Sequence, residues 1–457
     1  MFGIDRSVQN IVGAEEYGLY FSLLSLSILL NIILDAGITN YNNRSIAQNN
    51  DILKDHFAKI VPLKFFLSIV YSLIVLGSGL LLGYSNRQFN ILWVLIINQF
   101  LLSFILYLRS NISGLHLFRT DSFLSILDRF FVIIICSLLL WTNILGGEFR
   151  IEWFVYSQTL AYLLAAAIIF IIVIIRAGTI KFKFSFASTL SILKKSYPFA
   201  ILILLMSFFN RFDSVFLERM VEDGKTQAGI YAQSFRILDA ANMYSVLIAG
   251  MLLPIFSKML KEKQAVSEMV QLSFSIVIIP ALSLSVISFF YHREIIELLY
   301  NEHVAYSAQV FSVLINGFIF ISTSYIFGTL LTANGSLKQL NLIALFTVVL
   351  NLTLNFILVP RYKALGSAIA ALTSQMFFAF AQIIASVIIL KLKINFSYLF
   401  RLFSFIALLG GIGFFIHSKV LNWLLGLSLI ILFSILFSWI LKILSPRNLY
   451  KIVKYGD

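Results

Sequence analysis

The sequence predicts an all-α, polytopic membrane protein, and three observations lead to that class. Of the 457 residues, 60% are hydrophobic and only 12% are charged. Apolar stretches of about 20 residues, long enough for a helix to cross a bilayer, recur along the whole chain. These stretches lack the period-two alternation of barrel strands, so their backbone polar groups must be satisfied within helices.

We expect thirteen spans, whose clearest ends are marked by charged residues or by Asn and Gly. The single cysteine, Cys136, lies inside a span, so neither a disulfide nor a cysteine-based metal site is expected. The predicted spans are, in chain order, 17–38, 58–83, 89–108, 123–141, 152–175, 197–217, 228–257, 272–291, 310–332, 340–359, 365–390, 402–416 and 421–444.

Basic residues gather on one side of these spans. If the spans alternate in direction, 21 of the 34 lysines and arginines fall in every second loop and in the C-terminal tail, whereas 9 fall on the other side and 4 lie within spans. Because positive charge concentrates in cytoplasmic loops, we expect the C-terminus in the cytoplasm. The net charge of +13 therefore reflects topology, and no nucleic-acid partner is expected.

The chain contains an internal repeat. Gly18-Leu19-Tyr20 opens the first predicted span, and Gly229-Ile230-Tyr231 opens the seventh, each after a short acidic loop. Weaker matches between later spans have nearly the same offset. The repeat predicts an N-terminal lobe over residues 1–178, a C-terminal lobe over 179–395, and a terminal helix pair with a basic tail over 396–457.

The two halves differ at their beginning. The span 197–217 precedes the repeated glycine in the second half, whereas only a short segment precedes it in the first half. Gly3-Ile4-Asp5 aligns with Arg211-Phe212-Asp213, so we expect that about 15 residues of a first helix are missing; a natural start at Met1 with a stub helix is the alternative. The missing helix would bring the count to about fourteen spans and both termini to the cytoplasm.

Two short polar segments interrupt apolar spans. They are Asn210-Arg211-Phe212-Asp213 and Arg236-Ile237-Leu238-Asp239. A charged residue at the centre of a membrane helix costs about 3 kcal/mol or more, so such residues usually line a polar cavity or pair with one another. These segments are therefore the first candidates for a functional site.

Motifs spread along the chain combine into a family resemblance. They are Val12 to Tyr20, Leu34 to Ile38, Pro198-Phe199-Ala200, Asn210 to Asp213, Gly229 to Ala232, Arg236 to Ala240 and Gly366 to Ala370. In order and spacing they resemble the polysaccharide repeat-unit flippases of the multidrug/oligosaccharidyl-lipid/polysaccharide exporter superfamily. The resemblance covers essentially the whole chain, although most of the family's first helix is lacking.

The resemblance implies a transporter, not an enzyme, in the bacterial cytoplasmic (inner) membrane. Its implied task is to move an undecaprenyl-diphosphate-linked oligosaccharide to the outer leaflet by alternating access of two lobes, for a surface polysaccharide such as the O-antigen of lipopolysaccharide. The implied partners are that lipid-linked oligosaccharide, membrane lipids, a proton or sodium gradient and, loosely, polysaccharide assembly proteins. No cofactor, metal or direct use of ATP is expected, because the sequence has no metal-ligand cluster and no Gly-rich nucleotide loop.

The residues themselves fit this task. A diphosphate-sugar headgroup needs a wet, partly cationic cavity, and the planar fork of arginine can bind two phosphate oxygens at once. Arg211 and Arg236 are expected at similar depth, with Arg129 lower, as a basic path for the diphosphate; Asn210 is a further substrate-binding candidate. The competing interpretation is that these arginines only pair with nearby acids and hold helices together.

Asp213, Asp239 and Asp128 are the candidates for ion coupling. Desolvation raises the pKa of an aspartate toward neutrality, which would let it take up and release a proton during a transport cycle. Arg236 lies three residues before Asp239 on the same helix face and opposes that rise. Asp213 is therefore the better candidate.

Two further charged residues within spans, Asp35 and Lys64, are expected to have structural roles. Asp35 ends its span and is expected to cap or anchor the chain locally. Lys64 lies close enough to the cytoplasmic face for its long side chain to snorkel to the headgroups. Neither is assigned to the substrate.

Three other functions compete with the flippase. A drug or cation exporter of the same superfamily would more naturally present an acidic cavity. A membrane polysaccharide polymerase or ligase would carry a large external loop with basic and histidine residues, whereas the external loops here are short and on balance acidic. A membrane scaffold would have little reason to keep Arg211 and Asp213 within a span. The flippase is therefore placed first, followed by exporter, enzyme and scaffold.

Overall fold

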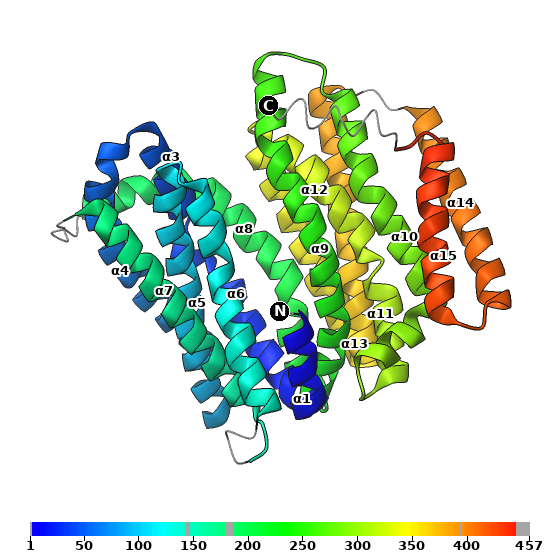
Figure 1. Cartoon of the computed structure of the whole chain (residues 1–457), viewed down its shortest axis with the longest axis horizontal. Coiled ribbons are helices and arrows are strands. Elements are labelled where there is room, and N and C mark those ends of the chain that lie inside the picture. Colours follow the sequence, from blue (N-terminus) through cyan, green and yellow to red (C-terminus); the bar gives the residue numbers. More distant parts are fainter. Residues whose placement is uncertain (1, 143–146, 179–185, 393–394, 445–457) are drawn as a thin grey trace. The chain divides into compact units, whose positions relative to one another are not determined.

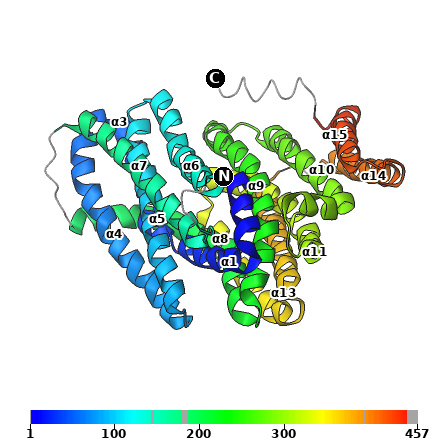
Figure 2. The same ribbon diagram turned by 60° about the horizontal axis from the view of Figure 1, so that its bottom comes forward.

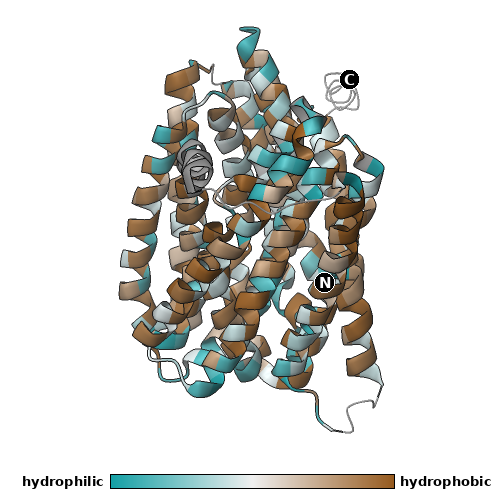
Figure 3. Cartoon of the chain, turned by 90° about the vertical axis from the view of Figure 1, so that its left-hand side faces the viewer, coloured by the Kyte–Doolittle hydropathy of each residue, from teal (hydrophilic) through white to brown (hydrophobic). Residues whose placement is uncertain are grey.

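A computed structural model of the chain describes residues 2–142, 147–178, 186–392 and 395–444, which form helices and turns without a strand among them. The chain folds as two compact units, Met1–Gly229 (unit 1) and Ile230–Asp457 (unit 2). Within the described residues, eleven helices are long and apolar enough to cross a membrane. Apolar residues cover most of their length (Figure 3). These features confirm the all-α, polytopic membrane class.

Unit 1 is built around four long helices, α4 to α7, that run side by side (Figure 1, Figure 2). Helix α5 packs against α7 and α1, α6 packs against α7, and α8 packs against α1. The elements of this unit are α1 Phe2–Leu29, α2 Ile32–Asp35, α3 Ile38–Gln48, the short 3₁₀ helix η1 Asn50–Ile52, α4 Leu53–Leu81, α5 Asn86–Gly114, α6 Phe118–Trp141, α7 Ile151–Ala177 and α8 Phe186–Met220.

Two breaks shape the first part of unit 1. Gly13 has φ 84° and ψ 167°, so α1 consists of two helical pieces on either side of it. Ala36 and Gly37 both have positive φ, 44° and 84°, and this turn separates α2 from α3. Positive φ costs a non-glycine residue free energy, and Gly37 accepts it without a Cβ clash. The predicted span 17–38 therefore covers the second piece of α1 and the short helix α2, and it ends in a sharp turn at the Leu-Asp-Ala-Gly motif.

Unit 2 contains most of α9 and the helices that follow it. Helix α10 packs against α11, α12, α14 and α15, and α12 packs against α13. The bounds are α9 Gly224–Lys261, α10 Ser267–Leu299, α11 Val304–Leu314, α12 Gly317–Ala333, α13 Leu337–Leu390, α14 Phe396–Lys419 and α15 Trp423–Ile440.

Helix α13 is a pair of spans rather than one. A straight helix of its 54 residues would be about 80 Å long, far more than a bilayer, but Lys363 (φ 51°, ψ −130°) breaks it. The Ser367 hydroxyl donates to the Asn355 side-chain oxygen at 2.9 Å and ties the two arms together. Gly366 allows this close return, because a Cβ there would lie 2.4 Å from the Leu358 carbonyl oxygen.

The predicted count of thirteen spans and the eleven helices found are closely related. The two predicted spans 340–359 and 365–390 are the two arms of α13, which counts as one helix. The predicted span 197–217 lies in α8, which is not among the eleven. The remaining predicted spans each coincide with one candidate membrane helix.

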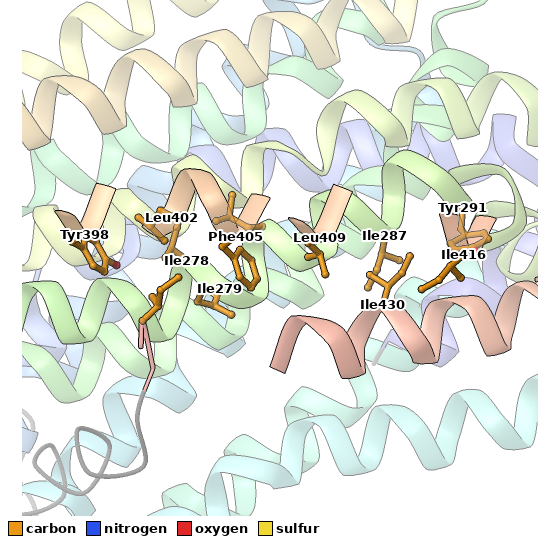
Figure 4. Packing of buried hydrophobic residues seen from close by; sticks show 12 residues of the cluster. Ile278, Ile279, Ile287, Tyr291, Tyr398, Leu402, Phe405, Leu409, Ile416 and Ile430 are labelled. Atoms are coloured by element: carbon orange, nitrogen blue, oxygen red, sulfur yellow. The ribbon is translucent and has the colours of Figure 1, made fainter. Parts of the chain in front are cut away.

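The terminal helix pair, α14 and α15, is held in unit 2 by a hydrophobic cluster with α10 (Figure 4). Phe405 and Leu409 of α14 are fully buried, and Ile278 and Ile287 of α10 and Ile430 of α15 belong to the same cluster. Two polar contacts accompany it: Ser275 with Tyr398 at 2.8 Å and Ser283 with Ser434 at 2.6 Å. The pair therefore packs on its unit through a specific seam.

The boundary between the compact units differs from that of the predicted lobes. The repeat placed residues 179–229 with the C-terminal lobe, whereas in the structure this segment belongs to unit 1. The reason is that α8 packs against α1 and that its Glu218 side chain accepts hydrogen bonds from α1 and α5. The lobes were defined by sequence repetition, and as such they stay a prediction.

Candidate substrate and coupling site

The predicted site residues lie on three helices. Asn210, Arg211 and Asp213 belong to α8 of unit 1, where Asp213 is 1% exposed and the other two are half-buried. Arg236 and Asp239 belong to α9 within unit 2, and both are half-buried. The structure thus places Arg211 and Asp213 in one unit and the second polar segment in the other.

The third helix of this set is α6 of unit 1. It carries Asp128 and Arg129. Asp128 is half-buried, whereas Arg129 is exposed at the surface of the chain. In a helix of membrane-spanning length, adjacent residues point in different directions, so these two do not share a face.

Aromatic residues of α8 stack on one another beside the polar segment. Phe208, Phe212 and Phe216, spaced four residues apart, form a ladder with ring centroids 4.7 and 5.7 Å apart. Arg211 and Glu218 are seven residues apart and therefore lie on the same side of the helix, two turns from each other. Arg211 and Asp213, two residues apart, point in different directions, so the charged side chains of this segment are spread around α8.

The counterpart of Asp213 in the repeat is Asp5, and it too is buried. Asp5 is 6% exposed and accepts a hydrogen bond from the Tyr17 hydroxyl at 3.1 Å. Nearby in unit 1, the Tyr20 hydroxyl and the Gln158 side chain are hydrogen-bonded, and the Gln9 amide donates to the Gly229 carbonyl oxygen at 3.0 Å. The interior of unit 1 therefore contains a series of polar contacts along α1.

A carboxylate that the sequence analysis did not single out, Glu218, joins three helices at one end of unit 1. Its side chain is 3% exposed and forms an ion pair with Arg219 at 3.1 Å. The Gln88 amide of α5 donates to it at 2.7 Å, and the Ser22 hydroxyl of α1 donates at 3.4 Å. In the sequence Glu218 lies just after a predicted span, but in the structure it is a buried hydrogen-bond acceptor. Its partners are far away in the chain, so the sequence alone does not reveal this role.

Tyr84, in the turn between α4 and α5, completes this cluster. The Arg219 guanidinium lies 4.3 Å from the centre of the Tyr84 ring, which is a favourable cation–π geometry. Burial raises the pKa of the Tyr84 phenol, and the nearby Glu218 carboxylate adds to that rise. Tyr84 therefore stays neutral and acts as a packing surface for the arginine.

The second unpredicted feature corrects the expectation for Lys64. It does not snorkel: the side chain is 1% exposed, and its ammonium group forms an ion pair with Asp35 at 2.6 Å. The ammonium also donates to the Leu34 carbonyl oxygen at 3.0 Å and to the Ser103 hydroxyl at 3.1 Å. All three N–H bonds of the ammonium have acceptors, so the buried charge is compensated.

Asp35 has the local role that was expected of it and a long-range role as well. Its carboxylate accepts hydrogen bonds from the backbone N–H of Thr39, at 3.2 Å, and from the Thr39 hydroxyl. These bonds satisfy the first turn of α3 after the break at Ala36 and Gly37. Asp35 therefore anchors the turn to α4 and α5 through Lys64.

Unit 2 has its own buried polar residues. Gln233 of α9 donates to the Glu302 carbonyl oxygen at 3.4 Å and its own carbonyl accepts from Tyr300 at 3.3 Å. Ser245 of α9 and Ser322 of α12 are 2.8 Å apart and both fully buried. Across the described parts of both units, no three His, Cys, Asp or Glu residues are grouped so as to hold a metal ion.

The chain is similar to a known protein family and to several solved structures. A sequence model of a family described as "Polysaccharide biosynthesis protein" matches residues 7–260. No curated protein matches the chain. Among solved structures, the lipid II flippase MurJ in an inward closed conformation is similar with a TM-score of 0.71 and 14% identity, covering 96% of each chain.

Multidrug transporters have a similar fold. An inward-facing multidrug resistance MATE family transporter of the MOP superfamily is similar with a TM-score of 0.64 and 13% identity, over 85% of this chain and 93% of that one. An outward-facing MATE structure is similar with a TM-score of 0.57 and 14% identity, with the same coverage. These similarities establish the fold of the chain. A lipid flippase and multidrug transporters both have it.

Proposed function

The chain belongs to the polysaccharide biosynthesis protein family, and on that premise we propose that it flips an undecaprenyl-diphosphate-linked oligosaccharide across the bacterial cytoplasmic membrane for a surface polysaccharide, with O-antigen as one such product. Transport would proceed by alternating access and draw on a proton or sodium gradient. The C-terminus would lie in the cytoplasm, as the distribution of basic residues favours. Contacts with other polysaccharide assembly proteins would be loose.

The observation that carries this proposal is the presence of arginines within helices of membrane-spanning length in a protein of this family. Arg211 is half-buried in α8 and Arg236 is half-buried in α9. Their retention in apolar surroundings costs free energy unless they meet an anion or a partner acid. A diphosphate supplies such an anion, and arginine binds it with two parallel hydrogen bonds.

The other predicted residues are given supporting roles. Arg129, exposed on α6, is proposed as an entry contact for the diphosphate, and Asn210 as a hydrogen-bonding group for the headgroup. Asp213 is the proposed coupling residue, with Asp239 and Asp128 as secondary candidates. The proposal contains no catalytic step, because flipping breaks no covalent bond.

An exporter of drugs or organic cations is the second candidate function. The similarity of the fold to MATE transporters favours it. A cation-binding cavity would need uncompensated acids, whereas both polar segments carry an arginine beside their aspartate. We therefore place it second.

The test is complementation of a strain that lacks its own flippase gene and therefore lacks surface polysaccharide. The chain is expressed as the wild type, as the double variant Arg211→Ala/Arg236→Ala and as the control Arg293→Ala, which removes an exposed arginine of α10. We expect the double variant to lose surface polysaccharide and the control to keep it, at equal protein levels in the membrane.

Two outcomes would contradict the proposal. Normal polysaccharide export with both arginines replaced would remove the diphosphate-binding role. Failure of the wild-type chain to restore export, combined with increased resistance to cationic drugs, would favour the exporter.

A further inference from the structure

Unit 1 has a cavity of about 420 Å³ at the level where three of its membrane helices end. Helix α4 begins there at Leu53, α5 ends at Gly114 and α7 ends at Ala177. The cavity is lined by Asp51, Leu53, Lys54, Leu115, Leu117, Arg176 and Ala177. Its volume lies in the range of small-molecule sites. Because helices of this kind end at the membrane surface, the cavity lies at the depth of the lipid headgroups.

The floor of the cavity is apolar and well packed. Leu53 and Ala177 are 5% and 8% exposed and form a buried cluster with Ile46, against which Leu115 packs. A purely polar ligand would gain little from this floor. A ligand with both a charged and a hydrocarbon part would use the whole cavity.

The charged rim is unusual for this end of the unit. Its neighbours are paired: Lys59 forms an ion pair with Asp55 at 2.5 Å, and Arg109 with Asp121 at 2.8 Å. Lys54 and Arg176 are exposed, and among the described residues neither has an acid within ion-pair distance. Two cations thus line one cavity with a single carboxylate, Asp51, and neither of them forms an ion pair.

Helix electrostatics explains one of these cations but not the other. Arg176 lies in the last turn of α7, where a positive charge is favoured by the helix dipole. Lys54 lies in the first turn of α4, where the dipole disfavours a positive charge. An anion in the cavity would reverse that cost, because it would meet Lys54 and the positive end of α4 together.

We propose that this cavity binds the phosphate of a membrane glycerophospholipid. Arg176 holds two phosphate oxygens with its planar fork, and Lys54 supplies a second positive charge. Leu53, Leu115 and Leu117 contact the glycerol and the first acyl carbons.

Asp51 sets the charge that this cavity accepts. With two cations and one carboxylate, the rim carries a net charge of +1, which matches a singly charged phosphodiester such as phosphatidylglycerol. A diphosphate carries more negative charge than the rim can neutralise and would be repelled by Asp51. The cavity is therefore distinct in specificity from a site for a diphosphate-linked lipid, and this inference does not depend on the proposed function.

The experiment compares lipid retention by three forms of the purified full chain. They are the wild type, Lys54→Gln/Arg176→Gln, and the control Lys59→Gln/Arg119→Gln. The control also removes two positive charges, from α4 and from the first turn of α6, but neither residue lines the cavity. Each is delipidated and titrated with phosphatidylglycerol, and bound lipid is counted by native mass spectrometry. We expect the cavity variant to bind about tenfold more weakly or worse, which is the size expected for two basic side chains near an anionic lipid.

A second variant and a competitor complete the experiment. Leu117→Trp narrows the cavity without changing its charge and is expected to lower phosphatidylglycerol retention as well, so the result does not depend on the folding of one variant. Equal loss in the cavity and control variants would reduce the effect to general surface charge and overturn the proposal. Displacement of phosphatidylglycerol by millimolar inorganic phosphate would assign the cavity to a soluble anion instead, and would also overturn it.

Discussion

Gly18 of α1 and Gly229 of α9, which occupy equivalent positions in the internal repeat, lie in direct backbone contact. A Cβ on Gly18 would lie 2.5 Å from the backbone nitrogen of Gly229 and 1.9 Å from the carbonyl oxygen of Lys225. A Cβ on Gly229 would lie 1.9 Å from the carbonyl oxygen of Ala14. The repeated glycines therefore allow two backbone segments of unit 1 to come into contact, as small residues permit in membranes.

Alanine at either glycine is expected to destabilise the fold. The neighbouring atoms belong to the backbone and cannot rotate away, so the helices must move apart. We expect Gly18→Ala and Gly229→Ala each to cost about 1–3 kcal/mol, the usual range for overpacking. Thermal unfolding of the detergent-solubilised protein measures this as a lower midpoint.

Gly77→Ala is the matched control for this prediction. Gly77 lies within α4, and a Cβ there would have no neighbour within 4 Å. Alanine should leave stability unchanged or raise it by up to about 1 kcal/mol, through its higher helix propensity. Equal unfolding midpoints for all three variants would mean that the backbone contact is not present in solution.

The sequence was sufficient to predict the helices, because a membrane span is a local property of about 20 residues. It was not sufficient for the buried charge contacts, because these depend on partners far away in the chain. Lys64 looked free to snorkel, since its partner Asp35 lies 29 residues earlier in the sequence, before the turn at Ala36 and Gly37. Glu218 looked like a span-end charge, since its acceptor role depends on Gln88 and Ser22, 130 and 196 residues away.

The predicted site shows the same division. The polar segments at Arg211 and Arg236 were visible because charge stands out against an apolar span. Their surroundings were not visible, because the neighbours of Phe212 and Arg211 depend on which helices pack around α8. The exposure of Arg129 on α6 likewise follows from packing and not from its spacing.

Removal of Lys64 is expected to destabilise unit 1 strongly. Lys64→Met would leave the Asp35 carboxylate without its counter-charge among α2, α4 and α5, and breaking a buried pair from one side typically costs about 3–5 kcal/mol. The double variant Asp35→Asn/Lys64→Met removes both charges and keeps an oxygen that can accept the Thr39 bonds. It should therefore be more stable than Lys64→Met alone.

An exposed ion pair on the same helix provides the control for these variants. Lys59→Met breaks an ion pair with Asp55 that is largely open to solvent, so its cost should stay below about 1 kcal/mol. The compensation argument fails if the double variant unfolds at the same midpoint as Lys64→Met or at a lower one.

The Glu218 cluster predicts that loss of a buried charge costs more stability than loss of an exposed one. The buried charge is Glu218, and the exposed one is Arg87, the residue next to its partner Gln88. Glu218→Ala removes the acceptor of Gln88 and the counter-charge of Arg219, and should cost about 2–4 kcal/mol. Arg87→Ala removes ion pairs with Glu16 and Glu152, but Arg87 is 48% exposed, so the cost should be under about 1 kcal/mol. Chemical unfolding midpoints of the two variants would test the order; a larger effect for Arg87→Ala would refute it.

Asp213 tests ion coupling in the proposed transport cycle. It is 1% exposed in α8, and its repeat counterpart, Asp5, is buried as well. An aspartate can bind and release a proton or hold a sodium ion with its negative charge, whereas an asparagine of the same shape cannot take up a proton and brings no charge to a sodium ion. We therefore expect Asp213→Asn in proteoliposomes to remove the dependence of lipid flipping on an imposed proton or sodium gradient. Downhill exchange without a gradient should continue.

Asp128→Asn, at a half-buried position of α6, serves as the comparison. If Asp213→Asn keeps the full gradient response while Asp128→Asn loses it, the coupling role belongs to α6. If both variants keep it, neither aspartate couples an ion to transport.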